Sequence, residues 1–545
     1  MVYGGKPSTG CYLCRKRKIK ASPSTRTPDS GACALYMLLQ RTRIYHMISA
    51  DTISSVMKLV LVVEIVTSTA VHARATGPTR SFATRLGKLS DNPEPSSSPS
   101  SSQSLMVVDR QHRPSPTLSL HRIADATWED RALCYFFDQY TVADNNEEGI
   151  GGHLEYLPPL YARAAKIEST AKGSPAACLR LAVDATALMT LANSSNAPPL
   201  MIKARHEYGK ALRGLREALA SPDSAVKDET FASVMLLSLY EDISGERNGL
   251  FSSHTAGFEF LMKLRGEGQL NHRRGRAMFN FAYAHTYVEI LALGDKPRHD
   301  IDRVLGSLDG NDPVEGLMLA ASRISQLFVS MQTVRTPPEL VTVVQWIEAG
   351  RRSDEELSQW PLQLPDRWLP LVVYSSTGEP LMVYKSVANA VIWNYYRAAR
   401  VMLQQLLFSI NRTYLSIKRK SRKPDDPSQV GSVLDEAALC AVVQEMTTDV
   451  CNSIPFCLSD VDELGRPTSS RGGKPIRAAQ AHGLIWPFWY ILSCGMPTEA
   501  QSNQIREVLW RIGSTLGIKL ALMLAREAER MRSESSAHAV GFSGS

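Results

Sequence analysis

Residues 505–524 read IREVLWRIGSTLGIKLALML, and their apolar side chains recur every three or four positions. This spacing puts the apolar side chains on one face of a helix, with polar and charged residues on the other face. The apolar positions are Ile505, Val508, Leu509, Ile512, Leu516, Leu520 and Leu524. They predict helical structure near the end of the chain, followed by a polar run at residues 527–536 that closes the fold.

Helical spacing recurs upstream, and several segments carry their own start or stop signals. One segment begins at Ser174-Pro175, which supply a cap residue and a proline in the first turn. The others are residues 228–242, 253–265 and 275–293. The last two stop at Gly266 and Gly294, and glycine often follows a helix because it readily adopts a left-handed conformation. Each of these segments is therefore expected to be a separate helix.

Strand signals are sparse in the sequence. Residues 372–374 form only a short candidate strand, and the best β-branched run, residues 59–66, lies near the N-terminus. We therefore expect an all-α fold class: a large multi-helix regulatory domain of about ten to fifteen helices, well above the usual helical share of about a third. A mostly disordered basic N-terminal arm is expected to precede it.

Charge is distributed unevenly along the 545 residues. Residues 1–88 hold 14 Lys and Arg against three acidic residues, although the whole chain has a net charge of only +7. A basic arm on a near-neutral body suggests that the arm meets a polyanion. Residues 92–104, NPEPSSSPSSSQS, contain no apolar side chain and predict a disordered linker. The expected parts are an arm at 1–45, a linker at 46–115, an all-α body at 116–533 and a disordered tail at 534–545.

The cysteine content favours a reducing compartment. Nine cysteines, an odd number without an apolar signal peptide in front of them, argue against a secreted disulfide framework. Residues 53–71 are apolar but are interrupted by Lys58 and Glu64, so no membrane association is expected. The Arg-rich, acid-poor N-terminus also matches a mitochondrial transit peptide in composition, but transit peptides need no contiguous basic run set between cysteines.

A zinc-binding pattern opens the chain. Residues 10–20 read GCYLCRKRKIK, in which Cys11 and Cys14 have the spacing of two thiolates that hold one tetrahedral zinc ion. The cations that follow are suited to DNA phosphates and guanine edges. These candidate DNA-binding residues are Arg15, Lys16, Arg17, Lys18 and Lys20.

The segment resembles the opening half of the DNA-binding module of fungal zinc binuclear-cluster transcription factors, in which six cysteines hold two zinc ions. Cys11 and Cys14 match the first two ligands, and Cys33 lies in a fragment similar to the neighbourhood of the fifth ligand. The resemblance places Arg17 and Lys18 in the recognition helix. It implies zinc as the cofactor and DNA with CGG-type half-sites as a partner.

Three of the six ligand positions depart from the family pattern, because Ala21, Ser30 and Gln40 stand where cysteines are expected. Since a structural zinc site supplies much of the folding free energy of such a module, this arm should not fold as the family's arm does. Three interpretations stay open. One is an aberrant gene model or splice form, and another is a degenerate regulator that binds DNA weakly through charge alone. In the third, a single zinc ion is held by Cys11, Cys14, Cys33 and His46.

Residues 116–531 resemble the fungal-specific regulatory domain that follows zinc clusters in this family. The segments that carry the resemblance are residues 230–245 (TFASVMLLSLYEDISG), 253–270 (SHTAGFEFLMKLRGEGQL), 275–298 (GRAMFNFAYAHTYVEILALGDKPR) and 481–494 (AHGLIWPFWYILSC). The resemblance implies an all-α domain that senses small effectors, often forms homodimers, and governs RNA polymerase II transcription through the transcription machinery in the nucleus. A helical interaction protein without specific DNA binding is the alternative.

Within the body, polar side chains on apolar helices are expected to be structural. His254 and His285 are predicted to be hydrogen-bonded packing residues. Asp300 and Asp302 are expected in a solvated loop. An aromatic cluster is assigned to a core helix in preference to a ligand-stacking surface, and it comprises Trp486, Phe488, Trp489 and Tyr490.

A second basic run, KRKSRKP at residues 418–424, suits an importin-binding signal or another polyanion contact, and a solvated loop is the alternative. The candidate nuclear localisation residues are Lys418, Arg419, Lys420, Arg422 and Lys423. No nucleotide-binding glycine motif, H-E-x-x-H metalloprotease motif or G-x-S-x-G nucleophile motif is present in the sequence. We therefore expect a regulator, with no catalytic residues, and not an enzyme.

Overall fold

In the computed structural model, segments with apolar residues at helical spacing form helices. The structure describes residues 126–142, 154–167, 174–247, 252–292, 294, 297, 299–334, 337–421, 434–468 and 476–540. The predicted arm at 1–45, the predicted linker at 46–115 and the β-branched run at 59–66 lie outside the described residues. The account below therefore concerns the body of the chain.

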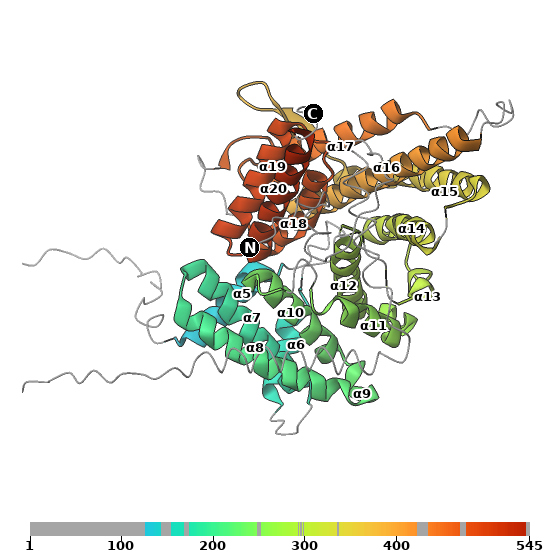
Figure 1. Cartoon of the computed structure of the whole chain (residues 1–545). Helices are drawn as coiled ribbons and strands as arrows, with labels where there is room; N and C mark the ends of the chain where they lie inside the picture. The colour runs from blue at the N-terminus through green and yellow to red at the C-terminus, as the bar shows by residue number, and fades with distance from the viewer. Residues whose placement is uncertain are drawn as a thin grey trace, which may run out of the picture. The chain divides into compact units, whose positions relative to one another are not determined.

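The α-helices of the described residues are shown in Figure 1. In chain order they are α5 (Trp128–Tyr140), α6 (Leu157–Lys166), α7 (Pro175–Ser195), α8 (Pro198–Leu219), α9 (Pro222–Ala225), α10 (Asp228–Ser244), α11 (Thr255–Arg265), α12 (Arg273–Ala292), α13 (Asp302–Leu305), α14 (Pro313–Thr333), α15 (Leu340–Gln359), α16 (Val387–Ser421), α17 (Glu436–Cys457), α18 (Ala478–Ser493), α19 (Glu499–Thr515) and α20 (Lys519–Val540). Three short 3-10 helices accompany them: η3 (Glu267–Asn271), η4 (Trp360–Gln363) and η5 (Asp366–Trp368).

The all-α prediction is confirmed for this part of the chain. Sixteen α-helices are found where about ten to fifteen were expected. The excess reflects short elements such as α9 and α13, each of four residues, which are too brief to produce a recognisable apolar period. Helical packing, and not sheet formation, therefore holds the body together.

A single hairpin supplies the strands of the described residues. Strand β1 (Leu371–Tyr374) pairs antiparallel with β2 (Pro380–Val383), and Leu371 lies opposite Val383. The short strand expected at residues 372–374 is thus present. Its partner contains a proline at the end of the ladder, where a missing backbone N–H costs little.

Helix α7 illustrates how the apolar helices are used. It packs against α5, α6, α8 and α10 and is buried on most of its surface. Among the described helices, it is the one long and apolar enough to span a bilayer, but most of that apolar stretch is already covered by protein. The expected cap is partly as predicted: Ser174 precedes Pro175, but its side chain makes no capping hydrogen bond.

Helices from both halves of the described chain share one hydrophobic core. Helix α16, the longest, packs against α14, α15, α17 and α18. Helix α18 also contacts α12 and α5, so the C-terminal helices are joined directly to the N-terminal ones. Buried apolar residues from α5 to α20 form one continuous cluster. The core aromatic residues predicted on α18 are all buried, as expected.

The apolar stripe at residues 505–524 belongs to two helices. Helix α19 ends at Thr515 and α20 begins at Lys519, with a turn between them in which Gly517 adopts φ +73°. The two helices pack against each other and both face the same core, so the apolar period continues across the turn. Helix α20 reaches Val540, beyond the predicted end of the body at residue 533, because residues 534–540, ESSAHAV, contain neither the glycine nor the proline that would end a helix.

The other predicted helix ends are close to those observed. Helix α11 ends before Gly266, which has φ +61°, and α12 ends at Ala292, before Gly294 with φ +67°. The expected start of α11 was wrong: the helix begins at Thr255 with His254 in the cap position, two residues after the predicted start. The exposed Asp300 and Asp302 border a short turn of helix, close to the solvated loop that was expected.

Candidate functional site

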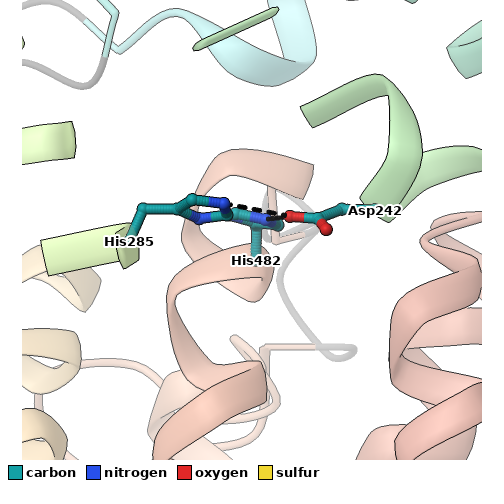
Figure 2. Close-up of side chains that lie close together, drawn as sticks. All are labelled: Asp242, His285 and His482. Carbon is teal, nitrogen blue, oxygen red and sulfur yellow. Dashed lines mark hydrogen bonds and ion pairs between the residues drawn. The ribbon is translucent and has the colours of Figure 1, made fainter. Parts of the chain in front are cut away.

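Three side chains from distant parts of the sequence meet inside the body: Asp242 from α10, His285 from α12 and His482 from α18 (Figure 2). The Oδ2 atom of Asp242 lies 2.8 Å from Nε2 of His482 and 3.8 Å from Nε2 of His285. The two imidazole rings are stacked, with 5.7 Å between their centroids. All three residues are buried. They form the centre of what is called here the buried polar cluster, namely Asp242, His285, His482, Arg247, Glu241 and Glu289.

The local sequence explains how the carboxylate reaches the interior. Helix α10 is buried on nearly all sides, so Asp242, near its C-terminus, has no route to solvent. Gly245 follows the helix with φ +71°, a conformation that suits glycine, and turns the chain so that Arg247 returns to the same region. A Cβ atom at residue 245 would lie 2.8 Å from Cβ of Lys519, so the space also requires glycine.

Arg247 is the buried cation that faces the acidic groups. Its Nη2 atom lies 2.9 Å from Oε2 of Glu289 and 3.5 Å from Oδ1 of Asp242, and none of the three side chains is exposed. Burial alone would raise the pKa of the Asp242 carboxyl, but Arg247 and the hydrogen bond with His482 outweigh burial and lower this pKa to about 2. Burial dominates at Glu289 and raises its pKa to about 7 despite Arg247.

Glu241 and Glu289 fix the chain that enters α11. The backbone N–H of Ser252 donates to Oε1 of Glu289 at 2.6 Å, and its hydroxyl donates to Oε2 of Glu241 at 2.8 Å. His254 places Nε2 3.2 Å from the Tyr208 hydroxyl and 3.6 Å from Oε1 of Glu241. These bonds connect α8, α10, α11 and α12 through polar side chains in the core.

The ring nitrogen of His285 is available in its neutral form. Burial lowers the pKa of His285 to about 4, although Asp242 opposes the shift. Its Nε2 atom lies 3.0 Å from the hydroxyl of Ser238 on α10. Neutral imidazole nitrogen and carboxylate oxygen are the ligand types of zinc and related metal ions. The ligand atoms of Asp242, His285 and His482 all lie within 4.8 Å of one another, so these three residues are the ones in the described chain that could hold a metal ion.

Sequence reasoning found part of this cluster. His254 and His285 are hydrogen-bonded, buried or half-buried residues, as predicted. The reasoning missed the other members of the cluster, Asp242, Arg247, His482, Glu241 and Glu289. The available signal was their setting: Asp242 and His482 are polar residues in helices whose other residues are almost all apolar, and such residues need buried partners.

Most of the other predicted site residues lie outside the part of the chain that the structure describes. The predicted zinc ligands Cys11, Cys14 and Cys33 lie outside the described residues, and so do all of the predicted DNA-binding residues, Arg15, Lys16, Arg17, Lys18 and Lys20. A solvated loop was the alternative for the second basic run, and the structure instead places residues 418–420 in the last turn of α16, where the charges of Lys418 and Arg419 interact favourably with the helix dipole. Arg422 and Lys423 lie outside the described residues.

Comparison with known proteins gives a family for part of the chain. Residues 158–308 match the fungal specific transcription factor domain. This range contains Asp242 and His285 but not His482. An uncharacterized protein of Emericella nidulans is 33% identical over 116 residues, which is 21% of this chain and 25% of that relative. The chain thus spans about a quarter of the length of that curated relative. No solved structure matches the chain. The chain therefore contains, within residues 158–308, a domain similar to the fungal specific transcription factor domain.

Proposed function

We propose that this protein is a fungal transcriptional regulator, with the helical body as its regulatory part. The observation that carries the proposal is the match of residues 158–308 to the fungal specific transcription factor domain. The all-helical packing of the described residues is consistent with it. The same match supports a non-enzymatic role in the nucleus. Contacts to the transcription machinery and homodimer formation are part of the proposal and rest on the sequence resemblance alone.

The arm is proposed as the part that meets DNA. Cys11, Cys14 and Cys33 supply thiolates for zinc, and the cations after Cys14 are suited to phosphates and guanine edges in CGG-type half-sites. The proposal rests on sequence alone, through the spacing of Cys11 and Cys14 and the five charges that follow. Electrostatic attraction by these charges favours DNA even without base-specific contacts.

A second candidate is a helical interaction protein that binds no specific DNA sequence. It is favoured by one specific observation: Ala21, Ser30 and Gln40 occupy positions at which the resembling module has zinc ligands. Without its full set of ligands, such a module lacks the metal that contributes most of its folding free energy. The body would then act through protein partners.

The two candidates differ in how DNA affinity depends on sequence and salt. We would measure binding of the purified full chain to duplexes with paired CGG half-sites and to scrambled duplexes over a series of salt concentrations. If the protein recognises the DNA bases, its affinity should be at least about tenfold higher for the CGG duplex, because each wrong base pair typically costs about 1–3 kcal/mol. Equal affinities with a steep salt dependence would support the second candidate.

Paired substitutions locate the DNA contact. Arg17→Ala with Lys18→Ala should weaken CGG binding and reduce its salt dependence, because two phosphate- or base-contacting charges are lost. Arg213→Ala with Arg216→Ala, at two exposed positions of α8, is the matched control with the same change of charge. An equal effect of both pairs would show that net charge, and not the arm, determines DNA binding.

A further inference from the structure

The buried polar cluster has a chemistry that DNA binding does not use. Asp242, His285 and His482 come from three helices and converge in the core, where an apolar side chain would ordinarily be more stable. Burying ionisable groups costs free energy unless they have good partners. The partners observed here account for only part of the bonding capacity of these groups.

The carboxylate of Asp242 shows this most clearly. Its Oδ2 atom accepts a hydrogen bond from His482, but its Oδ1 atom receives no hydrogen bond although the side chain is fully buried. The nearest cation to Oδ1 is Nη2 of Arg247, at 3.5 Å. A buried carboxylate oxygen with no donor is open to a further electrophilic partner.

The two separations from Asp242 bracket the spacing of ligands around a small tetrahedral ion, and all three ligand atoms lie within 4.8 Å of one another. Zinc binds histidine nitrogen and carboxylate oxygen at about 2.0–2.2 Å, which places neighbouring ligand atoms of a tetrahedral site about 3.3–3.6 Å apart. The observed separations from Oδ2 of Asp242, 2.8 Å to His482 and 3.8 Å to His285, lie on either side of that range.

The local charge also favours a cation. Asp242 and Glu289 lie within 3.5 Å of the guanidinium of Arg247, and Glu241 interacts with it electrostatically, so three carboxyl groups share one cation. Arg247 lies 2.9 Å from Glu289 and 3.5 Å from Oδ1 of Asp242, so it forms an ion pair with Asp242 without giving Oδ1 a hydrogen bond. The Ser238 hydroxyl, 3.0 Å from Nε2 of His285, is a neutral oxygen beside the same site.

We propose that Asp242, His285 and His482 form a binding site for a divalent transition-metal ion of the zinc class. Zinc would replace two hydrogen bonds, that of Nε2 of His482 with Asp242 and that of Nε2 of His285 with Ser238. A proton carried by either Nε2 atom would move to Nδ1 of the same ring, which leaves both rings neutral and both Nε2 lone pairs free for the ion. The ion would tie α10 and α12, which lie within the range 158–308, to α18, which lies outside it. The regulatory body would thereby respond to metal independently of the arm.

The test uses the full chain, untagged, with Cys11, Cys14 and Cys33 replaced by serine so that the arm thiolates cannot hold the ion. Zinc content after dialysis should be one equivalent, and the melting temperature should rise with zinc concentration, because a ligand that binds only the folded state stabilises it. Cobalt(II) in place of zinc should give visible d–d bands without the thiolate charge-transfer bands that cysteine ligands produce.

Three substitutions test the ligands, and a neighbouring histidine is the control. Asp242→Asn, His285→Gln and His482→Gln should each weaken zinc binding by more than the roughly 10–100-fold that loss of an outer-shell partner costs. His254→Gln should keep zinc binding, because His254 belongs to the same polar network but lies outside the group of three. Equal zinc affinity in His254→Gln, His285→Gln and His482→Gln would overturn the proposal.

The proposal remains testable if the ligand variants do not fold. In that case the zinc content and the cobalt(II) spectrum of the serine-substituted chain, whose body is unchanged, test the proposal. Absence of stoichiometric zinc at saturating concentration, or cobalt bands of the thiolate type from the remaining cysteines, would overturn the site. Failure of the chain to bind CGG duplexes would not, because the DNA assay concerns the arm and the zinc assay concerns the body.

Discussion

The side-chain amide of Asn193 donates to the carbonyl oxygen of Gly517 at 2.8 Å, although 324 positions separate the two residues. The same Nδ2 atom donates to the carbonyl oxygen of Ile243 at 2.6 Å. Asn193 on α7 thus joins the last turn of α10 to the turn between α19 and α20. Helix-terminal carbonyl groups lack partners within their own helix, and this amide satisfies one of them in the interior.

Replacing Gly517 with alanine should destabilise the body. Gly517 has φ +73°, and a Cβ atom there would lie 2.8 Å from Cβ of Asn193, so the substitution combines backbone strain with a steric clash. Backbone strain alone costs about 1–2 kcal/mol, and the clash should increase the loss of unfolding free energy measured in urea.

Two glycines separate the contributions to that loss. Gly495→Ala has a similar φ of +75° with no neighbour within 4 Å of the new Cβ, and should show the backbone contribution alone. Gly268→Ala meets no neighbour within 4 Å and has no left-handed φ, and should change stability little. A Gly517→Ala effect no larger than that of Gly495→Ala would show that the contact with Asn193 is not tight.

Arg247→Met should be strongly destabilising. The substitution leaves Asp242 and Glu289 buried without their shared cation, and breaking a buried ion pair from one side typically costs about 3–5 kcal/mol. The control is Arg205→Met, which breaks the exposed pair of Arg205 with Glu246 and should cost about 0–1 kcal/mol. Equal losses of unfolding free energy in the two variants would show that the cluster does not depend on Arg247.

Local chemistry allowed many of the helix ends to be predicted from the sequence. Gly266 and Gly294 were recognised as stops because glycine tolerates positive φ values, and both residues do have positive φ. The turn at Gly517 was not predicted, because the apolar spacing continues from α19 into α20 when both helices face one core. The spacing of apolar residues shows which face of a helix is buried, but it does not show where one helix ends and the chain turns into the next.

The buried polar cluster was predictable only in part. His285 could be assigned as a hydrogen-bonded core residue from its own helix, since a polar group in an apolar setting needs a partner. The identity of the partners could not be assigned, because Asp242 and His482 are 240 positions apart and meet only through the packing of α10 and α18 against a common core. The sequence around each of the two residues does not indicate that they are in contact.

Asp184→Asn should stabilise the protein near neutral pH. Burial raises the pKa of the Asp184 carboxyl from 3.8 to about 6, so the folded state holds its proton more tightly than the unfolded state does. The favourable contribution of the protonated acid is therefore complete below about pH 4 and is lost as pH rises through about 6. The asparagine variant should be more stable than the original by about 1–3 kcal/mol near pH 7.5, with little difference near pH 4.

Tyr161→Phe provides the opposite test at the same carboxyl. The Tyr161 hydroxyl donates to Oδ1 of Asp184 at 3.1 Å and favours the ionised form. Its removal should reduce stability most at neutral pH, where the carboxylate then lacks this donor. Urea unfolding of both variants at the two pH values checks the prediction, and a stability gain of Asp184→Asn that is equal at both would contradict it.

Replacing the basic run at the end of α16 with alanine should impair nuclear import. Lys418, Arg419 and Lys420 lie in the last helical turn, where they add to the charge supplied by Arg422 and Lys423. Import receptors recognise such clusters through their charge, so loss of five cations should bring the nuclear and cytoplasmic intensities of a fluorescent fusion of the full chain close to equality. The control pair Arg213→Ala and Arg216→Ala removes exposed charge from α8 and should leave the fusion nuclear. If the run were only a solvated helix end, both sets of variants would have the same distribution as the unmodified chain, and the nuclear signal would have to be sought in the basic arm.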